Sequence, residues 1–170
     1  MKIALYLGSF NPFHNGHLDV IKTALIDFGM DEVVIVPTMQ NPWKEEKVLD
    51  MDKRMDIIWE SLSTEVIIFT TIDPIEEKLI PPYYSYATLH ALKNKYCNDE
   101  VFILCGRDTI EDIPNWMNGE QIIKDYDFLI AYRGKFSISS TEIRNRVKNN
   151  ESLEGLVSPN VINLIRKYYE

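Results

Sequence analysis

The chain has 170 residues, of which 45% are hydrophobic, and this length suits one well-buried core better than two. Lysine and arginine number 18 against 26 aspartates and glutamates, so the formal net charge is −8. An acidic balance of this kind argues against a general surface for nucleic acid or for an anionic membrane. We expect a single domain over residues 1–170, with C-terminal helices at 140–170 as part of it.

The cysteine pattern and the apolar runs indicate the compartment. Cys97 and Cys105 lie in or beside apolar segments without the spacing of a metal site, which predicts buried free thiols in a reducing compartment. No apolar run approaches the ~20 residues of a membrane-spanning helix, and Met1-Lys2 leads at once into the first apolar run. We expect a cytoplasmic protein whose oligomeric state, a homo-oligomer included, the sequence leaves open.

Apolar runs alternate with amphipathic segments along the chain. Residues 3–7 predict a first strand, and Leu18 to Phe28 has apolar residues at spacings of three and four, which predicts a helix ended by Gly29. Later strands are expected at 32–36, Glu65–Phe69, 101–105 and 128–132. Later helices are expected at 51–62, 84–96, 109–113, 120–124, 141–148 and 160–169.

Strands that alternate with helices predict a parallel sheet covered on both faces. We predict an α/β, Rossmann-like, doubly wound sheet of five strands in the order 3-2-1-4-5. In this order the winding reverses between the first and fourth strands, so a crevice opens beyond their carboxyl ends. Two unusual turns border that crevice, residues 8–17 after the first strand and Gly106-Arg107-Asp108 after the fourth.

The first turn, Gly8-Ser9-Phe10-Asn11-Pro12-Phe13-His14-Asn15-Gly16-His17, has the features of a nucleotide site. A helix is expected to begin near Asn15, and its first turn supplies unpaired N–H groups and a dipole that favour a phosphate. His14 and His17 are three positions apart and can project from the same side. Gly8 and Gly16 lack Cβ, which lets a base or a phosphate approach the backbone. A lone histidine at a helix start is more often a solvated or capping residue.

A second helix start, Ile138-Ser139-Ser140-Thr141-Glu142-Ile143-Arg144, has two compatible interpretations. In the structural one, Ser139 caps the helix and Glu142 completes a capping box. In the functional one, Ser140, Thr141 and Arg144 place two hydroxyls, free N–H groups and a guanidinium around one helix start, which suits a pyrophosphate.

Both segments resemble motifs of the nucleotidyltransferase superfamily that includes the nicotinate-nucleotide and phosphopantetheine adenylyltransferases. Residues 8–17 resemble its Gly-x-Phe-x-Pro-x-His-x-Gly-His motif, and residues 138–144 resemble its Ile-Ser-Ser-Thr-x-x-Arg motif. The resemblance implies that an AMP unit moves from ATP to a phosphate monoester with release of pyrophosphate. It implies catalytic roles for His14, His17 and Arg144. The ATP-binding residues that it implies are Gly8, Ser9, Phe10, Gly16, Gly106, Asp108, Ser139, Ser140 and Thr141.

Mg²⁺ is implied to accompany the triphosphate, held mainly by phosphates and water. The acidic residues are spread along the chain and form no dedicated metal site in the sequence.

The middle of the chain resembles the nicotinate-nucleotide adenylyltransferases. Residues 102–109 and Trp116 resemble that family's Gly-x-Asp turn and the tryptophan that stacks on the pyridine ring. Residues 83–89 loosely match its Ser-Tyr-Thr-x-Asp-Thr-Leu segment, whose N–H groups receive the nicotinate carboxylate, and residues 41–44 stand where the family has Pro-Pro-His-Lys. The acceptor-binding residues that this resemblance implies are Lys44, Tyr84, Ser85 and Trp116.

Several alternatives stay open. Asn41, Trp43, Ser85 and Ala87 depart from the family pattern, Trp116 can be a partly buried core residue, and Asp108 can be a helix cap. The leading hypothesis is ATP-dependent adenylation of nicotinate mononucleotide in NAD biosynthesis. The alternatives are a phosphopantetheine adenylyltransferase, another small-molecule nucleotidyltransferase, or a nucleotide-binding module without turnover. A class I aminoacyl-tRNA synthetase fragment ranks last, because the chain is acidic and lacks a Lys-Met-Ser-Lys-Ser element. Preference for nicotinate over nicotinamide, and closure of residues 37–50 as a lid, are left open.

Overall fold

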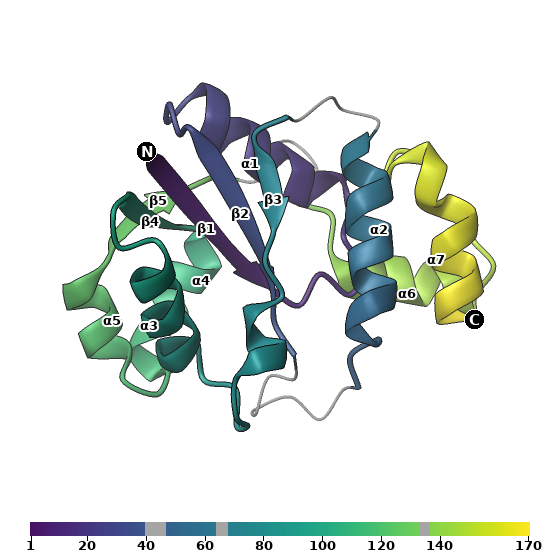
Figure 1. Cartoon of the computed structure of the whole chain (residues 1–170). Coiled ribbons are helices and arrows are strands. Elements are labelled where there is room, and N and C mark those ends of the chain that lie inside the picture. The colour runs from purple at the N-terminus through teal and green to yellow at the C-terminus, as the bar shows by residue number, and fades with distance from the viewer. Residues whose placement is uncertain (40–46, 64–67, 133–136) are drawn as a thin grey trace.

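The structure is a computed structural model that describes residues 1–39, 47–63, 68–132 and 137–170. Five parallel strands form one sheet in the order β3-β2-β1-β4-β5, as predicted (Figure 1). The strands are β1 (Lys2–Gly8), β2 (Glu32–Pro37), β3 (Thr70–Ile72), β4 (Glu100–Cys105) and β5 (Asp127–Ile130).

Helices connect the strands and follow the last of them. The α-helices are α1 (Asn15–Ile26), α2 (Met51–Ser63), α3 (Ser85–Lys95), α4 (Arg107–Asp112), α5 (Gly119–Asp125), α6 (Ser140–Lys148) and α7 (Ile162–Tyr169). Short 3₁₀ helices are η1 (Ile75–Lys78), η2 (Ile113–Asn115) and η3 (Pro159–Val161). In the described part of the chain, no helix has the length and apolar character needed to cross a membrane.

The sheet is buried on both faces because alternate residues of each strand point in opposite directions. On one face, Ala4 and Tyr6 of β1 belong to a buried cluster with side chains of α1, α2, α6 and α7. On the other face, Ile3 and Leu5 belong to a second cluster with side chains of α3, η2 and α5. Figure 1 shows this division, with α2, α6 and α7 on one side of the sheet and α3 and α5 on the other. The two motif helices α1 and α6 therefore share a face.

The third strand begins later than the apolar run predicted. Ile68 and Phe69 form a turn and are 75% and 57% exposed, and residues 64–67 of the predicted strand lie outside the described residues. Pairing starts where Thr70 lies opposite Val33, and the Val33 N–H donates to the Phe69 carbonyl oxygen at 3.0 Å. The prediction was wrong here because register against β2, rather than local hydrophobicity, selects the residues of this strand.

Other differences are small, except at one cysteine. Helix α1 begins at Asn15 as expected, and Gly29 adopts a φ of +62° after the helix end. β5 ends at Ile130 rather than at Tyr132. Among the described residues both cysteines are free, but only Cys105 is buried. Cys97 is exposed because it lies in the turn after α3, so the prediction of two buried thiols was wrong for this residue.

Candidate active site

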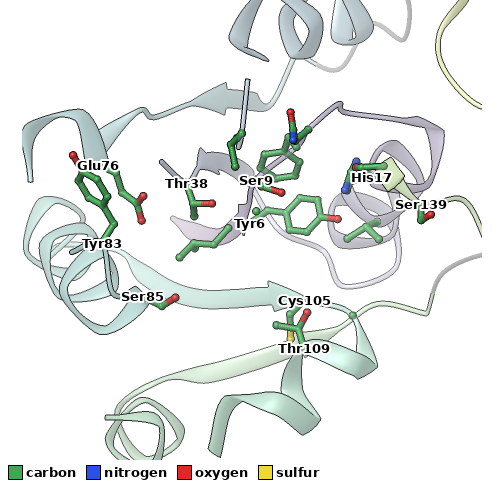
Figure 2. A pocket seen from close by; sticks show the side chains of 18 of the residues that line it. Tyr6, Ser9, His17, Thr38, Glu76, Tyr83, Ser85, Cys105, Thr109 and Ser139 are labelled. Atoms are coloured by element: carbon green, nitrogen blue, oxygen red, sulfur yellow. The ribbon is translucent and has the colours of Figure 1, made fainter. Parts of the chain in front are cut away.

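A cavity of about 410 Å³ opens at the carboxyl ends of the central strands, where the sheet order predicts a crevice. Figure 2 shows His17 and Ser139 at one end of this cavity and Glu76 and Tyr83 at the other. We call the two groups of lining residues the histidine end and the tyrosine end. The histidine end consists of His14, His17, Ser139, Ser140, Thr141 and Arg144. The tyrosine end consists of Glu76, Tyr83, Tyr84, Ser85 and Trp116.

The two histidines stack at the start of α1. His14 is the N-cap residue and is buried, and its ring centroid lies 3.7 Å from that of His17 with an interplanar angle of 23°. The backbone N–H of His14 donates to Nδ1 of His17 at 3.1 Å. Because Nδ1 accepts this hydrogen bond, Nε2 is the nitrogen that carries the proton in the neutral ring. The local fold thus sets His17 as a hydrogen-bond donor through Nε2.

An aromatic cluster fixes the orientation of the His17 ring. Phe13 stacks on it with a centroid distance of 5.2 Å, while Phe10 and Tyr6 meet it edge-on at 5.0 and 6.1 Å. Phe10 has a φ of +43°, which bends the chain so that its ring lies against Gly8. A Cβ on Gly8 would lie 3.0 Å from the Phe10 ring. Residue 8 is therefore glycine because the protein's own aromatic ring fills the space beside it.

The second motif forms the start of α6 and contacts the first motif directly. Ser139 Oγ accepts the Glu142 N–H at 3.1 Å, as the predicted cap requires, whereas the Glu142 carboxylate accepts from Arg146 Nε at 3.0 Å. Ser140 Oγ donates to the Pro12 carbonyl oxygen at 2.8 Å. Two residues more than 120 positions apart in sequence therefore join the two helix starts.

Arg144 completes the contact between the motifs. Its Nη1 donates to the Asn11 carbonyl oxygen at 2.6 Å, and its Nη2 donates to Thr141 Oγ1 at 3.2 Å. Both Arg144 and Thr141 line the cavity. The guanidinium is thus held at the edge of the cavity that His17 also lines, and the two predicted phosphate-binding elements share one space.

A buried arginine braces the first motif from α2. Arg54 is 1% exposed, and its guanidinium donates to the carbonyl oxygens of Ser9 at 2.6 Å, Thr38 at 2.8 Å and Leu49 at 2.7 Å. Burial lowers the pKa of Arg54 from its ordinary value, although the guanidinium stays protonated at any physiological pH. In the sequence Arg54 shares the helical spacing of the apolar residues Met51 and Ile58, which indicates burial but not the partners of its guanidinium.

The tyrosine end contains a buried carboxylate. Glu76 is 1% exposed, and it accepts the Met39 N–H at 2.6 Å and the Thr88 hydroxyl at 2.7 Å. Burial is the largest influence on its pKa, which it raises above the ordinary value. Glu76 carries no distinctive sequence pattern, because it is one glutamate in an acidic loop.

The start of α3 and the segment after η2 supply the rest of this end. Tyr84 is the N-cap residue of α3, and Ser85 is its first residue. Trp116 is partly buried, packs beside the second core cluster, and donates from Nε1 to Asp112 Oδ2 at 3.0 Å. Its ring therefore both packs on the core and forms part of the cavity wall.

Two of the predicted residues that the structure describes, Gly16 and Asp108, do not line the cavity. Gly16 lies beneath His14, and a Cβ there would be 3.1 Å from the His14 ring, so this ring occupies the space that was expected for a ligand. Asp108 is exposed on the first turn of α4, where Gly106 is the N-cap and does line the cavity. Lys44 lies outside the described residues.

Metal-binding clusters are absent from the described residues, where no three histidine, cysteine, aspartate or glutamate side chains gather closely enough to hold an ion. The single parallel sheet, with two helix starts paired at the carboxyl ends of its central strands, has the architecture of an α/β nucleotidyltransferase.

Comparison with known proteins agrees with this class. The family model described as cytidylyltransferase-like matches residues 5–146. A protein of Cytophaga hutchinsonii named "probable nicotinate-nucleotide adenylyltransferase" is 35% identical over 191 aligned positions, which cover 99% of this chain and 98% of the relative. The nicotinate-nucleotide adenylyltransferase of Bacillus subtilis is 28% identical over 186 positions, which cover 99% and 95%.

A solved structure has the same fold. The nicotinic acid mononucleotide adenylyltransferase of Plasmodium falciparum, complexed with NaAD, superposes with a TM-score of 0.78. It is 20% identical, and the match covers 98% of this chain and 95% of that one. The chain belongs to the nicotinate-nucleotide adenylyltransferases of the cytidylyltransferase-like family.

Proposed function

We propose that this protein transfers the AMP unit of ATP to nicotinate mononucleotide, giving nicotinate adenine dinucleotide and pyrophosphate, a step of NAD biosynthesis. The observation that supports this most is the cavity shared by His17 and Arg144, which come from two helix starts far apart in sequence. The names of the full-length relatives support the choice of acceptor.

The reaction needs positioning and charge stabilisation more than proton transfer. A phosphate oxygen of the acceptor attacks the α-phosphorus of ATP, the bond from that phosphorus to the bridging oxygen of the β-phosphate breaks, and pyrophosphate leaves with the electron pair. The attacking phosphate is already an anion, so no general base is required. In the proposal His17 Nε2 and the N–H groups of the α1 start stabilise charge on the α-phosphate. Arg144 and the α6 start hold the departing pyrophosphate.

The tyrosine end is the proposed acceptor site. The N–H groups at the start of α3, near Tyr84 and Ser85, suit a carboxylate such as that of nicotinate. The Trp116 ring forms a flat apolar wall on which a pyridine ring can stack. Lys44 stays a predicted acceptor contact outside the described residues.

Mg²⁺ enters the proposal as part of the substrate, bound to the triphosphate. Phosphate oxygens and water supply the oxygen ligands that Mg²⁺ prefers, so the triphosphate can carry the ion into the cavity. A cytoplasmic location is also proposed, since Cys97 and Cys105 are both free thiols.

The test is pyrophosphate release from ATP and Mg²⁺ with each of three acceptors: nicotinate mononucleotide, nicotinamide mononucleotide and phosphopantetheine. We expect release with nicotinate mononucleotide, with the dinucleotide identified by mass. Pyrophosphate release with phosphopantetheine alone would contradict nicotinate mononucleotide as the acceptor. ATP binding without release from any acceptor would contradict the enzymatic activity and favour a binding module.

A further inference from the structure

Asn11 of the first motif receives hydrogen bonds from three directions. It is 4% exposed. Its side-chain Oδ1 accepts the Tyr169 hydroxyl at 2.6 Å and the Leu49 N–H at 3.2 Å. Its backbone carbonyl oxygen accepts from Arg144 Nη1 at 2.6 Å. One buried residue thus connects α6, α7 and the segment before α2.

Tyr169 reaches this point from the last turn of α7. Burial raises the pKa of its hydroxyl, although the nearby Arg54 and Arg144 oppose that shift, so the hydroxyl stays protonated and acts as a donor at neutral pH. Both arginines lie on segments that hold the first motif, through the carbonyl oxygens of Ser9 and Asn11. Tyr169 therefore lies beside the connection between the two phosphate-binding elements.

We propose that Tyr169 and Asn11 are positioning residues for the triphosphate of ATP. The Tyr169 hydroxyl fixes the Asn11 side chain, and the fixed Asn11 backbone presents the carbonyl oxygen that orients the Arg144 guanidinium toward the cavity. The inference rests on the proposed function for the identity of the ligand. It adds that the C-terminal helix α7, which carries no sequence motif for nucleotide binding, sets the geometry of the pyrophosphate-binding group.

The position of this pair distinguishes two ligands. AMP lacks the β- and γ-phosphates that Arg144 is proposed to hold, whereas ATP carries both. A less firmly held Arg144 should therefore weaken the binding of ATP and leave the binding of AMP almost unchanged. If Tyr169 had only a structural role, Tyr169→Phe would disturb the whole cavity and would weaken the binding of both ligands by a similar factor.

The experiment measures the affinities of MgATP and AMP by titration calorimetry for the wild type and for Tyr169→Phe. We expect MgATP to bind about three- to tenfold more weakly, the loss typical of one neutral hydrogen bond, and the affinity for AMP to change less than twofold. Asn11→Ala removes the same hydrogen bond from its other side and should give the same pattern. Tyr168→Phe is the matched control, since the Tyr168 hydroxyl donates to Asp56 on the surface at 3.0 Å, and it should change neither affinity.

A double variant tests whether Tyr169 acts through Arg144. In an Arg144→Ala background, Tyr169→Phe should cause no further loss of ATP affinity, because the group that it positions is gone. Equal losses for ATP and AMP, unchanged ATP affinity, or fully additive losses in the double variant would each overturn the inference. These measurements need no acceptor, so they separate a failure of this inference from a failure of the proposed reaction. Thermal unfolding of each variant confirms that it is folded.

Discussion

The two ends of the cavity are held in different ways. At the histidine end, side chains from α2, α6 and α7 hydrogen-bond to the turn after β1, and the partners are 45 to 158 positions apart in sequence. At the tyrosine end the contacts are shorter in range. Trp116 bonds to Asp112 four residues away, and Glu76 bonds to Thr88 and Met39, which are twelve and 37 residues away.

This difference indicates which end tolerates change. At the histidine end several hydrogen bonds from different helices hold the turn after β1. This end also retains both motifs in full. The tyrosine end is held by contacts of shorter range, and its residue Ser85 departs from the pattern that the resemblance implies. In this account the chemistry depends on the first end and the choice of acceptor on the second.

The largest effect is expected from His17→Ala. This change removes the donor at the α-phosphate, and loss of one such donor costs about a hundredfold to a thousandfold in kcat. The measurement is the steady-state rate of pyrophosphate release with nicotinate mononucleotide. His90→Ala, at an exposed histidine of α3, is the control and should retain the wild-type rate. Equal rates for the two variants would show that the histidine end does not carry the chemistry.

Arg54→Met tests the rigidity of the same end. It leaves the carbonyl oxygens of Ser9, Thr38 and Leu49 without their buried donor, so we expect a loss of about 3 kcal/mol in the free energy of unfolding. Urea denaturation measures this loss. Arg107→Met removes an exposed guanidinium that pairs with Glu111 and should leave the free energy of unfolding almost unchanged. Similar losses in the free energy of unfolding for both variants would contradict the idea that Arg54 of α2 stabilises the turn after β1.

Trp116→Leu tests the tyrosine end. Stacking of an aromatic ring on a base is typically worth 1–3 kcal/mol, so the KM for nicotinate mononucleotide should rise about tenfold while the KM for ATP changes less than twofold. Trp59→Leu, at a 61% exposed tryptophan of α2, controls for loss of an indole and should leave both constants unchanged. A rise in the KM for ATP would mean that the two ends are not separate in function.

The smallest effect is a change in pH dependence at Glu76. Because burial raises its pKa in the folded state, the folded protein binds the proton more tightly than the unfolded chain does. The contribution of Glu76 to stability is therefore full below its unfolded pKa and is lost as pH rises through the raised pKa. Glu76→Gln should remove this slope in urea denaturation measured from about pH 4 upward. Identical slopes in the two proteins would show that burial does not perturb this carboxylate.

The sequence predicted the sheet order and the convergence of both motifs, because these follow from strong local signals and from the rules of parallel sheets. It misplaced β3, where the pairing of Thr70 with Val33 outweighs the apolar run before it. It also assigned the space at Gly16 to a ligand, whereas the His14 ring fills it, while Gly8 packs against Phe10 and lines the cavity.

The braces of the site were not foreseen for a different reason. Arg54 and Tyr169 act through backbone carbonyls and one amide, and such contacts depend on three-dimensional proximity rather than on any spacing in the sequence. Glu76 likewise forms a wall of the cavity only because β2 and α3 bring Met39 and Thr88 to it. Motifs reveal the groups that face a ligand more readily than the groups that hold them in place.

The most direct test is a crystal structure of the protein with Mg²⁺ and the non-hydrolysable analogue α,β-methylene-ATP. We expect the α-phosphate within hydrogen-bond distance of His17 Nε2, and the β- and γ-phosphates at the start of α6 beside Arg144. A triphosphate that contacts only one of these two helix starts, with its tail directed away from the other, would contradict this expectation.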